Sequence, residues 1–279
     1  MDDPFRLLVY FAHPDDESFG FAGSMAMLAD NGADLTYICA TRGDVGEILV
    51  EGLTTPDELG TFREGELRAA LKIIGVQHLR LLGYRDSGME GTPENRDPRA
   101  FVNAPVPIVA HQVADIILET KPDVFITYGP DGIYGHPDHV HVHTTAVPAV
   151  HEAADRGWPV PNLYFSAASR ERVMRMAERP GNPFNAMPPE KLATFGTPAA
   201  EITTWIDVSS VFERKIAAMR AHRSQMGDDG PFSTIPEETR REWLSVESAR
   251  MIPTPWNEHP NDVLLARLPE APLDHQFRS

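Results

Sequence analysis

The stretch Leu7-Leu-Val-Tyr-Phe-Ala-His-Pro-Asp-Asp-Glu17 passes directly from a continuous apolar run into a His and three acidic residues. Such a run is typical of a strand buried on both faces of a parallel sheet. In open α/β sheets, ligands bind beyond the carboxyl ends of the strands. This stretch therefore predicts both the kind of sheet and the edge at which a site lies.

Working outward, apolar runs alternate with helical patterns. Strands are expected at residues 7–12, 35–40, 79–82 and 124–128, and helices at 18–31, 61–74 and 108–120. This alternation predicts an α/β fold with a doubly wound, mostly parallel, Rossmann-like sheet that carries helices on both faces. The second half is less regular, with strands expected at 163–166 and 202–207 and a helix at 210–225. No linker or repeat divides the chain, so we expect one α/β domain over 1–279, with 151–279 as its less regular, specificity-bearing part.

Two helix starts are predicted from local hydrogen-bonding signals. Thr61-Phe-Arg-Glu64 and Ser210-Val-Phe-Glu213 each fit a capping box. Gly32 is expected to end the helix at 18–31 in a left-handed conformation.

The composition and charge of the chain exclude some classes of binding partner. The 279 residues include 25 Lys and Arg against 41 Asp and Glu, a formal net charge of −16. Phosphate backbones bind clustered Lys and Arg, so neither nucleic acid nor an anionic membrane is expected as a partner. No apolar stretch approaches the ~20 residues that cross a bilayer, and the acidic start is unlike a signal peptide. We expect a cytoplasmic protein that binds a small molecule, and a homo-oligomer is compatible with the sequence.

A second polar cluster follows the strand expected at 124–128. It is Tyr134-Gly-His-Pro-Asp-His139, followed by His141 and His143. A lone His is usually just a polar residue, but two dense His and Asp clusters at one sheet edge favour a divalent metal. The only cysteine, Cys39, lies in the strand expected at 35–40, so His and Asp would have to supply the three protein ligands of a hydrolytic zinc.

Spacing leaves the ligand assignment open. His136 and His139 are three residues apart, whereas His139 and His143 are four apart and would share a helix face, so either pair is able to bind metal. Asp15 and Asp16 would point in opposite directions in an extended chain, which suits one as a metal ligand and the other as a general base.

The paired motifs Ala12-His-Pro-Asp-Asp-Glu17 and Gly135-His-Pro-Asp-His139 resemble those of the LmbE-like, PIG-L family of zinc-dependent N-acetylglucosamine deacetylases. The resemblance implies that His13, Asp16 and His139 hold Zn²⁺, with Fe²⁺ as the alternative metal. It also implies that Asp15 is the general base.

The same resemblance gives the second motif a role in the transition state. His136, in its protonated form, stabilises the oxyanion, and Asp138 orients His136. It assigns no role to His141 or His143, for which we favour ordinary structural roles.

Further segments are similar to the branch of the family that contains the mycothiol deacetylase and the mycothiol S-conjugate amidase. They are Thr41-Arg-Gly-Asp-Val-Gly-Glu47, Phe62-Arg-Glu-Gly-Glu-Leu67, Arg85-Asp-Ser-Gly-Met89 and Ala221-His-Arg-Ser-Gln225. This similarity implies that Glu47, Arg63 and Asp86 contact sugar or inositol hydroxyls, although each also has a plain structural interpretation.

The expected activity is hydrolysis of the acetamide of an N-acetylglucosamine-type substrate, such as a glucosaminyl-inositol. An amidase that cleaves a larger acyl group, such as a mycothiol-type S-conjugate, is the first alternative. The Lys that such amidases tend to carry after the first motif is absent from Ser18-Phe-Gly-Phe21, which favours deacetylation. The remaining alternatives are a metal-dependent sugar-binding protein without turnover and a two-metal phosphoesterase that recruits His141 or His143.

Overall fold

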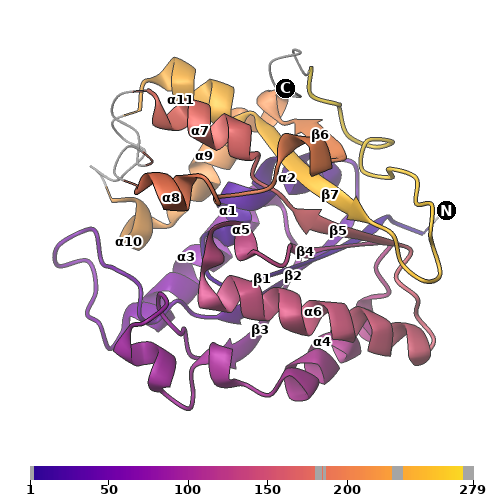
Figure 1. Ribbon diagram of the computed structural model, residues 1–279, viewed down its shortest axis with the longest axis horizontal. Coiled ribbons are helices and arrows are strands. Elements are labelled where there is room, and N and C mark those ends of the chain that lie inside the picture. Colours follow the sequence, from indigo (N-terminus) through magenta and orange to yellow (C-terminus); the bar gives the residue numbers. More distant parts are fainter. Residues whose placement is uncertain (1–2, 180–183, 185–186, 228–234, 273–279) are drawn as a thin grey trace.

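A seven-stranded sheet, in the order β3-β2-β1-β4-β5-β7-β6, forms the centre of the molecule (Figure 1). The computed structural model describes residues 3–179, 184, 187–227 and 235–272. The strands are β1 (Arg6–Phe11), β2 (Asp34–Thr41), β3 (His78–Tyr84), β4 (Val124–Tyr128), β5 (Asn162–Ser166), β6 (Thr204–Asp207) and β7 (Val246–Ile252).

Five neighbouring strands, β1 to β5, pair in parallel, whereas β7 pairs antiparallel with both β5 and β6. The predicted fold class, a mostly parallel α/β sheet, is confirmed. Strand β7 has no counterpart among the predicted strands, because the polar residues Glu247 and Ser248 interrupt its apolar pattern. Both side chains are nevertheless buried.

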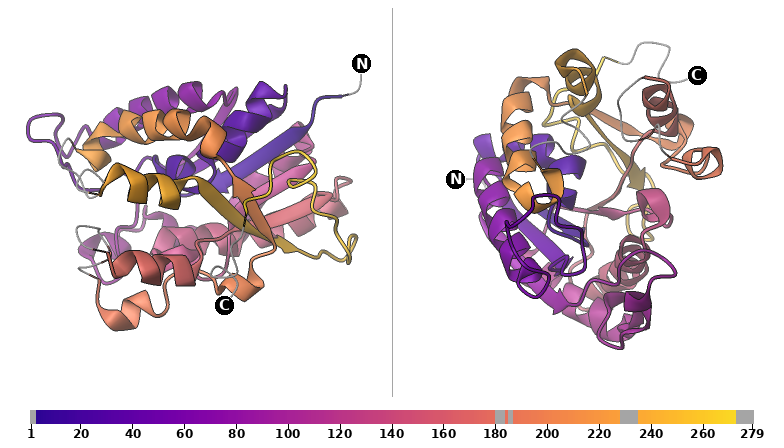
Figure 2. Two further views of the ribbon diagram at one scale, coloured as in Figure 1. Left: turned by 90° about the horizontal axis from the view of Figure 1, so that it is seen from above. Right: turned by 90° about the vertical axis from the view of Figure 1, so that its left-hand side faces the viewer.

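Helices cover both faces of the sheet (Figure 2). One layer contains α2 (Ala22–Asp30), α3 (Leu59–Ile74) and α9 (Phe212–Ala221), which contact one another, and the other pairs α4 (Val106–Thr120) with α6 (Pro137–Asp155). The shorter helices are α1 (Asp16–Gly20), α5 (Gly132–Gly135), α7 (Arg170–Ala177), α8 (Pro189–Leu192), α10 (Arg223–Met226) and α11 (Glu237–Leu244). Among the residues described, no helix combines the length and apolar character needed to cross a membrane.

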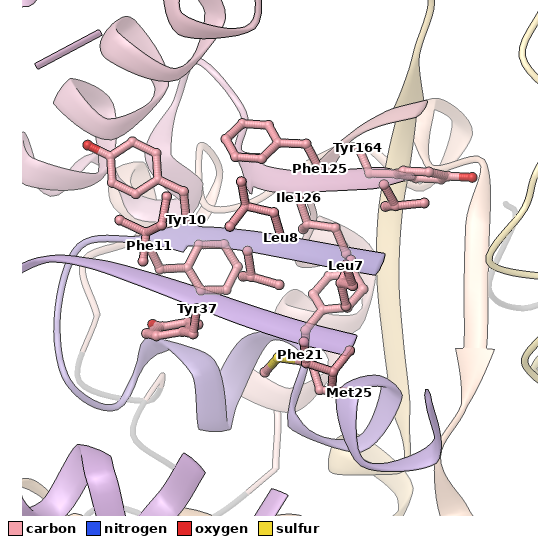
Figure 3. Close-up of a cluster of buried hydrophobic side chains, with 14 of the residues drawn as sticks. Leu7, Leu8, Tyr10, Phe11, Phe21, Met25, Tyr37, Phe125, Ile126 and Tyr164 are labelled. Atoms are coloured by element: carbon pink, nitrogen blue, oxygen red, sulfur yellow. The ribbon is translucent and has the colours of Figure 1, made fainter. Parts of the chain in front are cut away.

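The main core lies on both sides of the central strands. Leu7, Leu8 and Phe11 of β1 pack with side chains of β2 and β4, among them Tyr37 and Phe125 (Figure 3). The same cluster extends from the first strand to Leu264 and Leu268. Burial of β1 on both faces is what the continuous apolar run predicts.

Both capping-box predictions are wrong. Helix α3 begins at Leu59, two residues before Thr61, and its N-cap residue Glu58 makes no side-chain capping bond. Leu59 is buried, so tertiary packing extends the helix beyond the local signal. Helix α9 begins at Phe212 after a 3₁₀ turn, and the Ser210 hydroxyl instead lies 3.6 Å from the Met27 sulfur. Gly32 does follow the C-cap residue of α2 in a left-handed conformation, with φ of 79°.

Two predicted helices are each divided in the structure. The helix expected at 18–31 is interrupted at Phe21, and α2 then starts anew where the carboxylate of Glu247 accepts the Gly23 and Ser24 N–H groups, both at 2.8 Å. The helix expected at 210–225 breaks at His222, which separates α9 from α10. Both interruptions depend on contacts between residues more than 190 positions apart in the chain, which no local pattern reveals.

Candidate active site

The candidate site lies where the strand order reverses. Strand β1 pairs with β2 on one side and with β4 on the other, and the chain leaves these neighbours in opposite directions along the sheet. The crevice at such a switch point is the usual ligand site of a doubly wound sheet. His13 follows β1, and the segment from Gly129 to His139 follows β4, so both predicted clusters meet here.

Three potential metal donors converge at this point. His13 Nδ1 lies 3.2 Å from His139 Nε2 and 3.4 Å from Asp16 Oδ2. Asp16 Oδ1 lies 3.4 Å from His139 Nε2. Ligands bound 2.0–2.1 Å from a tetrahedral zinc stand about 3.3 Å apart, and each of the three separations is close to that value, with one Asp16 oxygen beside each imidazole.

The far side of each imidazole fixes which nitrogen faces the centre. His13 Nε2 lies 3.1 Å from Asp138 Oδ2, and His139 Nδ1 lies 3.2 Å from the Gly132 carbonyl oxygen. A carboxylate and a carbonyl accept hydrogen bonds, so these outer nitrogens carry the protons and the facing nitrogens present lone pairs. Metal-bound imidazoles are held in this way in proteins, and a cation between the two lone pairs would satisfy both.

The electrostatics of the cluster also suit a cation. Burial by itself lowers the pKa of His13, but Asp86, Asp138 and Asp16 together raise it well above its usual value. Burial raises the pKa of Asp16, but His139 and His13 hold it well below its usual value. The carboxylates thus favour positive charge at His13, which a bound cation would supply in place of a second ring proton.

Asp15 and Asp16 point in different directions, as expected for adjacent residues. The Asp15 carboxylate lies 3.2 Å from the guanidinium of Arg63, whereas the Asp16 carboxylate contacts His13 and His139. Burial raises the pKa of Asp15 to about 6, against the opposing effect of Arg63. The carboxylate is therefore ionised at neutral pH and has a pKa close to that pH, as a general base requires.

His136 is a neutral imidazole, not the protonated one expected from the sequence. Its Nδ1 accepts the main-chain N–H of Asp138 at 3.1 Å, so the ring proton lies on Nε2. Burial and the neighbouring His13 and His139 lower its pKa to about 4. At neutral pH this group offers a hydrogen bond rather than a full positive charge.

Asp138 contacts His136 through its main-chain N–H, whereas its carboxylate has other partners. The carboxylate accepts the Ser87 main-chain N–H at 3.0 Å and the Ser87 hydroxyl, and it faces His13 Nε2. Asp138 is fully buried, and these partners make it a support for His13. Ser87 is a residue that the sequence did not assign, although it lies in the quoted segment Arg85-Asp-Ser-Gly-Met89.

The three predicted substrate contacts occupy different positions. Arg63 is buried and donates to the carbonyl oxygens of Pro14 at 2.6 Å and Gly43 at 2.9 Å. Asp86 is buried in the cluster, 3.6 Å from His13 Nε2. Glu47 is exposed, and its main-chain oxygen accepts a bond from the Gln225 side chain at 2.7 Å. Arg63 thus braces the first motif, whereas the Glu47 side chain is exposed to solvent.

In the second cluster, His136 rather than His143 lies beside His139. His136 and His139 form a group with His13 whose ligand atoms all lie within 4.8 Å of one another. His143 instead binds the carbonyl oxygen of Tyr128 through Nδ1 at 2.9 Å. His141 packs edge-on against Phe101. The pair His139 and His143 does not converge.

A polar cavity of about 910 Å³ opens next to this cluster, between the loops that follow β2 and β3. Its lining includes Arg42, Asp44 and Arg85 but none of the three converging donors. Asp44 links the two places, because its carboxylate accepts the Asp86 N–H at 3.1 Å and an Arg85 bond at 2.8 Å.

A doubly wound sheet, a His and Asp cluster at its switch point and a carboxylate with a raised pKa beside it together define a metal-dependent hydrolase. Comparison with known proteins gives the family. Residues 8–150 match the PIG-L family, described as GlcNAc-PI de-N-acetylase, and the chain belongs to this family. Its members are deacetylases, so the chain is an amide hydrolase, as the sequence predicted.

Similar proteins support this assignment. The deacetylase of 1D-myo-inositol 2-acetamido-2-deoxy-alpha-D-glucopyranoside from Geodermatophilus obscurus is 38% identical, over 88% of this chain and 92% of the relative. The protein of the same description from Acidothermus cellulolyticus is 40% identical, over 86% of each. The N,N'-diacetylchitobiose deacetylase structure from Pyrococcus horikoshii shares the fold, with a TM-score of 0.58 and 20% identity over 94% of this chain and 89% of that one.

Proposed function

We propose that this chain removes the acetyl group from an N-acetylglucosamine unit joined to an inositol or a related ring. The observation that carries the proposal is the Asp15 carboxylate beside three converging donors, in a chain whose relatives at 38% and 40% identity are named for such a substrate. We propose Zn²⁺ as the metal, with Fe²⁺ as the alternative, because sites built from two His and one Asp accept both.

His13, Asp16 and His139 would hold the metal. Two other groups overlap this set, His13 with His136 and His139, and His13 with Asp86 and Asp138. The set of His13, Asp16 and His139 is favoured because His136 Nδ1 is engaged by the Asp138 N–H and His13 Nε2 faces Asp138. Bound zinc would polarise the acyl oxygen and lower the pKa of its water to about 7. Asp86 and Asp138 would then support His13 from behind.

Asp15 would take the proton from the attacking water. Its carboxylate is ionised at pH 7, and Arg63 holds it in place through one hydrogen bond at 3.2 Å. The proton would subsequently pass from Asp15 to the amine that leaves, since a base in the first half of an acyl transfer serves as the acid in the second.

His136 would stabilise negative charge on the acyl oxygen. Its Nε2–H is the free donor, because Nδ1 is engaged by Asp138 N–H. A fixed neutral donor aimed at a developing oxyanion typically contributes ~10²–10³ in rate. The exposed Glu47 and Asp86 beside His13 are proposed to contact sugar or inositol hydroxyls. Arg63 would contribute through its contact with Asp15.

No feature of the site favours the alternatives. The relatives are named deacetylases rather than conjugate amidases. A binding protein without turnover would not need a carboxylate of raised pKa at this place. A two-metal phosphoesterase would need His141 or His143 as ligands, and both face elsewhere.

Acetate release tests the proposal directly. The zinc-loaded protein would be assayed with N-acetylglucosaminyl-inositol, free N-acetylglucosamine, an S-conjugate with a larger acyl group and a phosphate monoester. We expect the highest kcat/KM on N-acetylglucosaminyl-inositol. Faster cleavage of the S-conjugate or of the phosphate ester would contradict the proposed substrate.

A further inference from the structure

Asp15 has an unusual main-chain conformation. Its φ is 116° and its ψ is −29°, and only two other non-glycine residues in the described part of the chain, Lys121 and Ile133, have positive φ. A non-glycine residue keeps such a conformation only where its surroundings enforce it, and functional sites are where such residues gather. The turn lets Asp16 contact His13 and His139 while the neighbouring Asp15 carboxylate contacts Arg63.

The main chain of Asp15 is held by a buried carboxylate. Glu17 Oε2 accepts the Asp15 N–H at 3.0 Å. Its other oxygen, Oε1, accepts the Ser18 hydroxyl and lies 2.6 Å from His222 Nε2. Glu17 and His222 are both fully buried, so the carboxylate is stable there only because it is paired.

His222 reaches this place from a distant part of the chain. It lies at the break between α9 and α10, in the segment Ala221-His-Arg-Ser-Gln225, which the proposed function leaves without a role. Ser224 binds the buried carboxylate of Glu66 at 2.8 Å and 2.6 Å, which fixes the segment against α3. The second half of the chain therefore contacts the first motif through His222 and Glu17, and Glu17 in turn holds the main chain of the proposed base, Asp15.

We propose that Glu17 and His222 are positioning residues whose buried ion pair holds the Asp15 main chain in its strained turn and so aims the Asp15 carboxylate at the reacting centre. This inference rests on the proposed function. Without the Glu17 carboxylate, the Asp15 N–H would lose its acceptor, and the turn would be free to relax. A displacement of about 1 Å at a reacting group costs about 10²-fold in rate.

A double-mutant cycle on kcat tests the coupling to Asp15. We expect Glu17→Ala to lower kcat about 10²-fold, with KM within threefold and a full metal content. In an Asp15→Asn background the same change should alter kcat less than threefold, because the group that it positions is already gone. Equal losses in both backgrounds, or a kcat close to wild type, would overturn the proposal.

Conservative variants separate positioning from folding. Glu17→Gln keeps an oxygen for the Asp15 N–H and should recover at least tenfold of the lost kcat. If Glu17→Ala does not fold, Glu17→Ala/His222→Ala removes both charges together, leaves no unpaired buried charge, and should show the same loss. Normal kcat in that folded double variant would refute the role.

The matched control is the other buried ion pair of α9. Lys215 Nζ lies 2.7 Å from Glu247 Oε1 and 3.3 Å from the Phe19 carbonyl oxygen, so it joins α9 to strand β7 and to α1 without touching Asp15. Lys215→Met should lower the melting temperature. At temperatures below that transition, its kcat should stay within threefold of the wild-type value. If Lys215→Met lowers kcat as much as Glu17→Ala does, the loss follows from removing any buried ion pair here, and the positioning role of Glu17 is contradicted.

A crystal structure of Glu17→Ala gives a readout that needs no activity. We expect Asp15 to leave positive φ and its carboxylate to move from Arg63. An unchanged Asp15 would contradict the inference. Absence of acetate release from the wild type would instead contradict the proposed function, so the two failures are distinguishable.

Discussion

At the scale of single residues, two neighbouring carboxylates have opposite environments. The pKa of Asp16 is held low by His139 and His13, whereas burial raises that of Asp15 to about 6. Asp16 is suited to remain an anion that binds a metal, and Asp15 is suited to accept and return a proton. The adjacency of the two was visible in the sequence, but their division of labour required the fold.

Asp15→Asn should keep the metal and lose turnover. The amide retains the shape of the side chain but cannot take a proton, and general-base catalysis typically contributes 10²–10⁴ in rate, so kcat should fall about 10²-fold or more. Elemental analysis would check the metal, and acetate release the rate. The matched variant Asp16→Asn should lose both the metal and turnover, because Asp16 is a proposed metal ligand. A near-normal kcat in Asp15→Asn would remove Asp15 from the base role.

Asp138→Asn should weaken metal binding rather than act on His136. The carboxylate supports His13 and binds Ser87, and loss of such a partner typically costs about 10–100-fold in metal affinity. Competition with a chelator would measure the affinity. Unchanged affinity with a lower kcat would instead restore the link to His136 that the sequence suggested.

At the scale of elements, the sequence located strands more reliably than helix ends. Strand β4 was predicted with its observed bounds, because continuous apolar runs follow from burial alone. The starts of α3 and α9 were missed, because Leu59 and Phe212 enter their helices through tertiary packing that overrides a local capping signal. The broken helix at Phe21 depends on Glu247 of β7, a strand that the sequence did not reveal.

The start of α2 leaves no space beside Gly23. A Cβ there would lie 2.5 Å from Val208 Cβ, whereas a Cβ at Gly65 of α3 would meet no atom within 4 Å. Gly23→Ala should therefore destabilise the protein by about 1–3 kcal/mol. Gly65→Ala should be neutral or stabilise it by up to about 1 kcal/mol. Thermal unfolding would compare them, and equal melting temperatures would contradict the close contact.

The junction of α9 and α10 should make stability depend on pH. Burial lowers the pKa of His222, but Glu17 and Asp15 raise it above its usual value in spite of Arg63. A raised folded pKa gives stabilisation that is complete below the unfolded pKa of about 6.5 and is lost as pH rises through the folded value. His222→Gln should therefore lower the melting temperature more at pH 6 than at pH 9. A pH-independent difference would mean that His222 is uncharged.

At the scale of the whole molecule, the two halves of the chain complete one site. Strands from both halves share the sheet, and His222 lies behind Asp15. The sequence predicted the fold class and the residues that converge, because His13 and His139 follow strands that meet at one sheet edge. It could not predict the support from Ser87 and His222, since their contacts join distant segments, or from Glu17, whose bond to the Asp15 N–H depends on the turn at Asp15. The single-domain organisation, oligomeric state and location remain predictions.

Metal titration of the metal-free protein tests the central claim, that one metal held by His13, Asp16 and His139 serves deacetylation by Asp15. Acetate release from N-acetylglucosaminyl-inositol would be followed as Zn²⁺ is added in fractions of an equivalent. We predict that the rate rises linearly and stops rising at one equivalent per chain, with no rise in His139→Ala. A rise that continues to two equivalents, or full activity before any metal is added, would contradict the account.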